Sequence, residues 1–126
     1  MKLNHLHLTV TDVSEARKFL ETYFGLQGKV NPYSGESMEG GKENRNFTLL
    51  FDDDGLALTL MAAGKATVVE YPGYFHIGFI QESEEQVNEL YRRLKDDGFV
   101  VDPPKRLHAW TFYVVAPGGF TIEVAA

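Results

Sequence analysis

The first part of the chain has a strand pattern followed by a helix pattern. Residues 4–10 alternate polar and apolar side chains, as expected of a half-buried strand. Asp12 then provides a helix N-cap, with Glu15 three positions later in a capping-box arrangement. Apolar residues recur at helical spacing from there to Gly25, a residue type that commonly ends helices. The pattern predicts one strand and one helix in quick succession.

The second half of the chain repeats this plan. Residues 75–80 read as a strand, Ser83 provides an N-cap, and the following helix ends at Gly98. Such self-similarity predicts two copies of one structural unit. Further strands are predicted after each helix, at about 27–33, 45–52 and 56–62 in the first half and 99–102, 106–115 and 119–125 in the second.

The repeat therefore predicts an α+β protein made of two βαβββ modules. The modules span about 1–64 and 72–126, and together they form a single domain over residues 1–126. The Gly-rich stretch 33–45 is predicted to be a long loop, and loops of that length are often functional.

Composition narrows the classes of function. The chain has 126 residues, 44% of them apolar, which suits a folded domain rather than a disordered segment. A net charge of −6 argues against nucleic-acid binding, which needs a basic face. No apolar run is long enough to span a membrane, and the N-terminus lacks a signal-peptide pattern, so we expect a cytoplasmic protein. The absence of cysteine means that any metal site would use His, Asp or Glu.

Strand parity places several polar side chains on one face. In residues 4–10 the leucines and the valine share one face, which leaves His5 and His7 on the other. The same rule puts His76 and Glu123 on the face away from the helices. His5 and His76 hold equivalent positions in the repeat, as do Thr59 and Glu123.

Two imidazoles and one carboxylate form a ligand set suited to a divalent ion. This 2-His-1-carboxylate set is typical of Fe(II), and Zn, Mn or Ni are also chemically reasonable. If the two sheets enclose one cavity, His5, His76 and Glu123 converge there as ligands. The competing interpretation is that each is an ordinary structural or surface residue, which is common for a single His or Glu on a strand.

Three segments of the chain resemble the vicinal oxygen chelate superfamily, which includes glyoxalase I, extradiol dioxygenases, and fosfomycin and bleomycin resistance proteins. The segments are 4–12, 74–79 and 116–124, and the resemblance extends over nearly the whole chain. It implies an open, cup-shaped mixed sheet with the helices on its outer face. It also implies that His5, His76 and Glu123 are the metal ligands, and that the chain forms a homodimer in which modules of different subunits can complete each cavity.

The chain departs from each of the better-known members. Glyoxalase I has a fourth ligand, a glutamate, at the position of Thr59, so its four-ligand site would be incomplete here. The fosfomycin enzymes have a threonine at the position of His7. Extradiol dioxygenases usually contain two pairs of modules, whereas this chain has one pair.

The resemblance favours a metal-dependent enzyme of lyase, dioxygenase or thiol-transferase type. A small substrate would bind the ion through two neighbouring oxygens, with the ion as Lewis acid. His7 is the candidate general base or supporting residue, although it could instead be structural, and Thr59 could hydrogen-bond the ligand. We predict that four further residues contact the substrate: His108, Trp110, Phe112 and Arg45.

Two other interpretations remain open. Bleomycin resistance proteins are acidic dimers that bind cationic drugs between aromatic side chains without a metal, and the acidic charge here is compatible with that role. The chain could also be a metal-free scaffold or regulatory protein. A bound divalent ion would separate the enzyme hypothesis from both.

Overall fold

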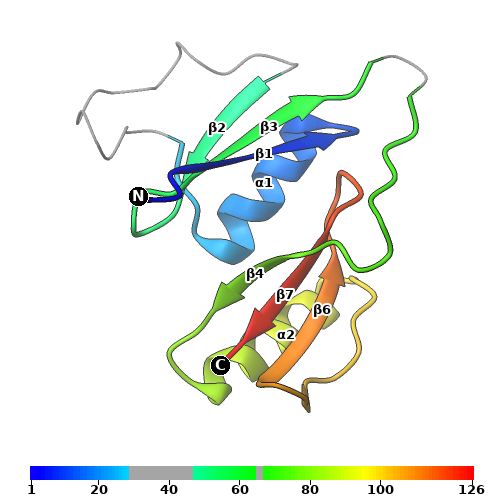
Figure 1. Cartoon of the computed structure of the whole chain (residues 1–126). Helices are drawn as coiled ribbons and strands as arrows, with labels where there is room; N and C mark the ends of the chain where they lie inside the picture. Colours follow the sequence, from blue (N-terminus) through cyan, green and yellow to red (C-terminus); the bar gives the residue numbers. More distant parts are fainter. Residues whose placement is uncertain (29–46, 65–66) are drawn as a thin grey trace. The chain divides into compact units, whose positions relative to one another are not determined.

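The chain divides into two compact units, Met1–Val69 and Glu70–Ala126 (Figure 1). A computed structural model describes residues 1–28, 47–64 and 67–126. Each unit contains one helix and one mixed sheet, which confirms the predicted α+β class. The predicted loop at 33–45 lies outside the described residues.

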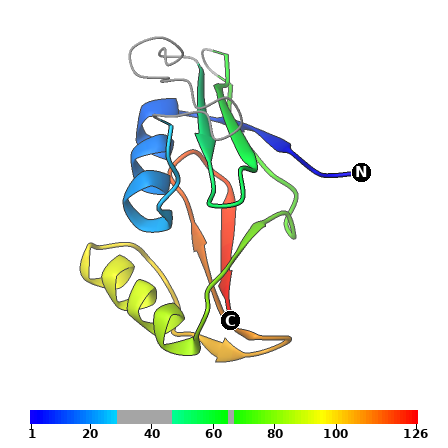
Figure 2. The same cartoon turned by 90° about the vertical axis from the view of Figure 1, so that its left-hand side faces the viewer.

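The first unit contains a three-stranded sheet in the order β1-β3-β2. β1 runs parallel to β3, and β2 runs antiparallel to β3. The helix contacts β2 and β3 and lies on one side of this sheet (Figure 2). The elements in chain order are β1 (His5–Val10), α1 (Val13–Phe24), β2 (Phe47–Phe51) and β3 (Ala57–Ala62).

The helix α1 begins and ends where the sequence predicts. The Asp12 carboxylate accepts a hydrogen bond from the Glu15 backbone N–H at 2.9 Å, which satisfies one of the unpaired donors of the first turn. Gly25 ends the helix with φ 66°, in the left-handed region that favours glycine. Leu8 and Val10 are buried while His5 and His7 are exposed, as strand parity requires.

The second unit contains a four-stranded sheet in the order β4-β7-β6-β5. β4 is parallel to β7, whereas β6 is antiparallel to both of its neighbours. The elements in chain order are β4 (Ile77–Ile80), α2 (Glu84–Asp96), β5 (Lys105–Arg106), β6 (Trp110–Val115) and β7 (Thr121–Ala125).

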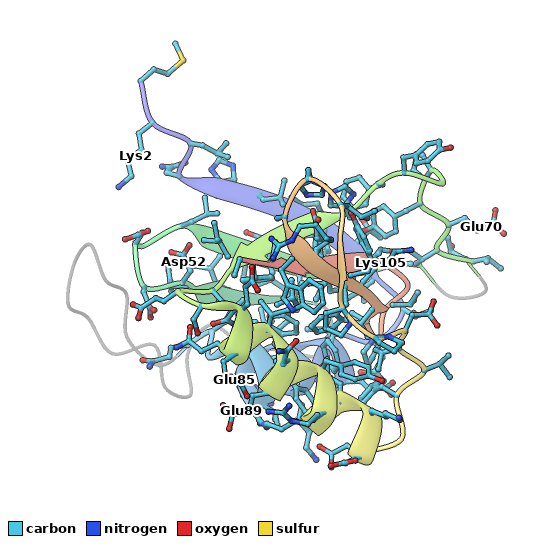
Figure 3. All side chains as sticks on the ribbon, turned by 90° about the horizontal axis from the view of Figure 1, so that it is seen from below. Lys2, Asp52, Glu70, Glu85, Glu89 and Lys105 are labelled. Carbon is cyan, nitrogen blue, oxygen red and sulfur yellow. The ribbon has the colours of Figure 1, made fainter. Side chains whose placement is uncertain are left out.

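One face of α2 is buried and the other is exposed. Ser83 and Gln86 form a reciprocal capping box at its start. The buried side chains of the helix, of β7 and of the residue just before β7 supply much of the core of this unit: Val87, Leu90, Leu94, Phe120, Ile122 and Val124. Glu85 and Glu89, labelled in Figure 3, are one turn apart on the exposed face of the helix. Neither helix within the described part of the chain is long and apolar enough to cross a membrane.

The strands after each helix differ from the prediction. Residues 99–102 form no strand, because the Phe99 N–H bonds back to the Leu94 carbonyl and Pro103–Pro104 provide no N–H donors. The predicted strand 106–115 is interrupted by a turn at 107–109, so that β5 and β6 form a hairpin. In the first unit, only a single bridge from Gln27 to Phe51 represents the predicted strand 27–33, whose residues from 29 onward are not described.

Candidate functional site

Glu123 lies at the centre of the second sheet and is almost completely buried. It is on β7, directly beside Gly78 on β4 and Tyr113 on β6. Its exposed fraction is 7%, and no other ionisable side chain is buried in the parts of the chain that the structure describes. A buried carboxylate is costly unless hydrogen bonds or cations compensate for the lost water. The groups that contact Glu123 therefore show how its burial is compensated.

One carboxylate oxygen of Glu123 is surrounded by donors. Oε1 accepts from the Tyr113 hydroxyl at 3.0 Å and lies 2.8 Å from Nε2 of His108. The Thr111 hydroxyl is 2.9 Å from Oε1 and 2.8 Å from the Val124 carbonyl, so its single proton serves one of these two acceptors. These contacts occupy Oε1 and fix the orientation of the carboxylate.

The other oxygen, Oε2, faces His76. The His76 Nε2 lies 3.3 Å from it. The His76 Nδ1 lies 3.0 Å from the Tyr74 carbonyl oxygen, which can only accept, so Nδ1 carries a proton. In a neutral imidazole this leaves Nε2 as an acceptor that points at another acceptor. A proton or a metal cation between the two atoms would turn this repulsive pair into a favourable one.

The environment of Glu123 favours the charged carboxylate. Burial alone would raise the pKa of Glu123, but the hydrogen bonds from Thr111 and Tyr113 and the nearby His108 and His76 hold it below its ordinary value. Burial, and then the hydrogen bond to Glu123, raise the pKa of Tyr113, which keeps its hydroxyl protonated and able to donate. The site is therefore an anionic position with an imidazole nitrogen facing it.

The predicted residues of the first unit lie on the exposed face of its sheet. His5 Nδ1 is 2.7 Å from the amide oxygen of Asn4, so this imidazole also presents Nε2 as its free nitrogen. His7 is paired with Thr59 across the parallel β1–β3 contact. His5 and His7 are exposed and Thr59 is half-buried.

The residues predicted to contact substrate do not all lie on the same face of the second sheet. His108 lies in the turn between β5 and β6 and reaches Glu123. Trp110 and Phe112 point to the helix side of the sheet, where Trp110 donates to Asn88 at 2.8 Å and Phe112 has an edge contact with Tyr91. They therefore do not share the face of Glu123. Arg45 lies outside the described residues.

Thr111 and Tyr113 are the site residues that the sequence interpretation did not assign to Glu123. The alternation of apolar and polar residues along β6 indicates the face on which both residues lie. Phe112 and Val114 are apolar and buried, so parity places Thr111 and Tyr113 on the opposite face together with Glu123.

The second unit contributes a pair of candidate ligands. No group of three His, Asp or Glu side chains within residues 1–28, 47–64 and 67–126 is arranged to hold a metal ion. The pair His76–Glu123 nevertheless has the donor chemistry that a divalent ion needs, with a lone pair on nitrogen and an oriented carboxylate oxygen.

Comparison with known proteins identifies the family. Residues 2–124 match the Glyoxalase/Bleomycin resistance protein/Dioxygenase superfamily. The chain belongs to this superfamily. The match confirms the resemblance of the sequence to vicinal oxygen chelate proteins. No curated protein matches the chain.

Solved structures of superfamily members share the fold. The structure of a possible glyoxalase from Bacillus cereus is 52% identical, with a TM-score of 0.84, and the alignment covers 100% of this chain and 99% of that one. Lactoylglutathione lyase from Agrobacterium tumefaciens is 17% identical, with a TM-score of 0.71 and coverage of 98% and 92%. A mutant of the fosfomycin resistance protein FosX from Listeria monocytogenes, complexed with Mn(II) and 1S,2S-dihydroxypropylphosphonic acid, is 21% identical, with a TM-score of 0.70 and coverage of 99% and 91%. The last two likenesses concern the fold alone.

Proposed function

We propose that this superfamily member is a divalent-metal-dependent enzyme that acts on a small substrate chelated through two neighbouring oxygens. The proposed ligands are His5, His76 and Glu123. The observation that carries the proposal is the contact between His76 Nε2 and Glu123 Oε2, in which two acceptors face each other at 3.3 Å. Iron, manganese, zinc and nickel are the candidate ions.

The spacing of this pair suits two ligands of one ion. Nitrogen and oxygen ligands lie about 2.0–2.2 Å from a Zn²⁺-sized ion, so two ligand atoms at roughly right angles are about 3 Å apart. The observed 3.3 Å is close to that separation. The His76 Nδ1–H bond to a backbone carbonyl is also the usual support for an imidazole ligand, because it fixes the tautomer and the ring orientation.

The other residues would orient ligands or move protons. A bound ion would supply Lewis-acid polarisation of the chelated oxygens. Thr111 and Tyr113 hold Oε1 of Glu123 and so direct Oε2 toward the ligand position. We propose His7 as a general base, since it is exposed beside Thr59, whose hydroxyl can hydrogen-bond a substrate oxygen. Thr59 occupies the place of the fourth glyoxalase I ligand, so the ligand set does not indicate glyoxalase I activity in particular. Substrates of lyase, dioxygenase and thiol-transferase type should therefore all be assayed.

Elemental analysis of protein purified without chelator or nickel resin tests the proposal. We expect about one divalent ion per chain in the wild type, and its loss in H5A, H76A and E123Q. His7→Ala is the matched control, because it removes an imidazole from the same strand as His5 without removing a proposed ligand. Wild-type protein that contains no metal and takes up no added Fe, Mn, Zn or Ni would refute the enzyme proposal and favour a metal-independent ligand-binding protein.

We further propose that the chain works as a homodimer. Ile80 and Val115, at opposite ends of the sheet face that carries Glu123, are 86% and 64% exposed, and a second copy of the chain on this face would cover both. Light scattering coupled to gel filtration gives the oligomeric state. Mixing H5A with E123Q then shows whether ligands of one site come from two chains, because only a shared site regains metal in the mixture.

A further inference from the structure

Gly78 is a glycine that neither backbone geometry nor packing requires. Among the described residues, five other glycines, such as Gly25 and Gly98, have positive φ and so adopt a conformation that favours glycine, but Gly78 is not among them. A Cβ added at Gly28 would lie 2.9 Å from the Leu49 carbonyl oxygen, whereas one added at Gly78 would meet no heavy atom within 4 Å. Glycine inside a strand normally weakens it.

The position of Gly78 suggests why a side chain is absent. Gly78 is the direct neighbour of Glu123 across the parallel β4–β7 pair, on the face that also carries His76. On the opposite side of Glu123, the phenol of Tyr113 fills the space. Adjacent strands are about 4.8 Å apart, so a side chain at position 78 would stand next to the carboxylate. Gly78 leaves that side open.

The first unit provides an internal comparison. His5 and His76 are equivalent in the repeat, so Gly78 corresponds to His7, and Glu123 corresponds to Thr59. His7 is paired with Thr59 in the same parallel register in which Gly78 is paired with Glu123. The strand position therefore accommodates an imidazole in one module and has no side chain in the other. The fold does not demand the small residue.

We propose that Gly78 is a specificity-determining residue, which keeps open the approach of a chelating ligand to His76 and Glu123. The size of the residue at this position limits the size of the ligand. The proposal rests on the proposed function in treating His76 and Glu123 as the ligand-binding pair. The ligand class is a small molecule with two adjacent oxygens, for which acetohydroxamate is a suitable probe.

Two measurements on Gly78→Leu test the proposal. In Co(II)-loaded protein, visible absorption reports acetohydroxamate binding, and we expect Gly78→Leu to weaken it at least about tenfold while Co(II) affinity changes little.

In metal-free protein, diethyl pyrocarbonate acylates exposed imidazoles. His76 lies on a different tryptic peptide from His5 and from His108, so mass spectrometry gives its rate separately. We expect slower acylation of His76 in Gly78→Leu.

The controls separate this proposal from the proposed function. Gly73→Ala also adds a Cβ in open space, but outside the strand, and should change neither probe binding nor acylation. An unchanged His76 acylation rate and unchanged probe binding in Gly78→Leu would overturn the role of Gly78. Slower acylation of His76 in a protein that takes up no metal would support the access role and refute the metal-dependent function.

Discussion

Tyr113→Phe isolates one hydrogen bond to the buried carboxylate. The substitution removes the hydroxyl that donates to Glu123 Oε1 at 3.0 Å and retains the ring, which makes an edge contact with His76 at 5.6 Å between centroids. A hydrogen bond to a charged group contributes about 1.5–3 kcal/mol. Tyr113 is 37% exposed, so water can replace part of the lost bond. We therefore expect the free energy of unfolding to fall by about 1 kcal/mol near neutral pH.

The pH dependence of this loss has a definite sign. The pKa of Glu123 is depressed in the folded protein, so the stability from its ionised form is present above its unfolded pKa, about 4.5, and disappears as the pH falls through the lower folded value. Tyr113→Phe weakens that depression. The mutant and the wild type should differ most at about pH 7, and the difference should disappear only as the pH falls through the depressed folded pKa of Glu123.

Urea unfolding followed by tryptophan fluorescence measures this difference. Trp110 is the single tryptophan and lies on the same strand as Tyr113, so it reports on the second unit. Tyr74→Phe serves as the control, because Tyr74 is 98% exposed and its carbonyl contact with His76 is retained. A Tyr113→Phe loss that is equal at all pH values, or no larger than that of Tyr74→Phe, would refute the reasoning.

Three further predictions follow from the same contacts. Thr111→Val removes a fully buried hydroxyl whose proton is shared between Glu123 and Val124, and should lower the free energy of unfolding in urea by about 1–2 kcal/mol. Ser83→Ala breaks a capping box and should cost about 1 kcal/mol in thermal unfolding followed by circular dichroism, whereas Ser14→Ala, within the first turn of α1, should cost less. Removing the metal with a chelator should lower the unfolding free energy by about 2.7 kcal/mol, if the free ion was present at about 100 times its Kd. Differential scanning calorimetry with and without the chelator measures this loss, and Glu123→Gln should show none.

Much of the fold follows from local signals in the sequence. Helix α1 lies between Asp12 and Gly25 because capping and left-handed termination are chemical properties of those residues. The apolar residues at 99–101 suggest a strand, but the Phe99 N–H bonds back to the helix and Pro103 and Pro104 supply no ladder donors. The turn at 107–109 was also missed, since no Gly or Pro marks it.

The site was only partly predictable for a related reason. Parity places His76 and Glu123 on one face, because side-chain alternation is a local property of a strand. The contact of His108 with Glu123 depends on the β5–β6 hairpin, which brings a turn residue to a side chain 15 positions further along the chain. The aromatic character of Trp110 suggested a ligand cavity, but its indole N–H donates to Asn88 of α2. Trp110 has the same parity as the buried Phe112 and Val114, so it lies on the helix side of the sheet and not on the face of Glu123.

The arrangement around Glu123 is better explained by function than by stability. Three side chains approach Oε1, and this requires a buried anion whose desolvation an apolar residue would have avoided. Oε2 is directed at Nε2 of His76, a contact that is favourable only with a proton or a metal cation between the two atoms. Gly78 adds a further local cost by leaving the neighbouring strand position without a side chain. The desolvation of Glu123 and the missing side chain at position 78 are local costs to the isolated fold, and under the proposed function a bound cation with its chelated ligand would compensate for both.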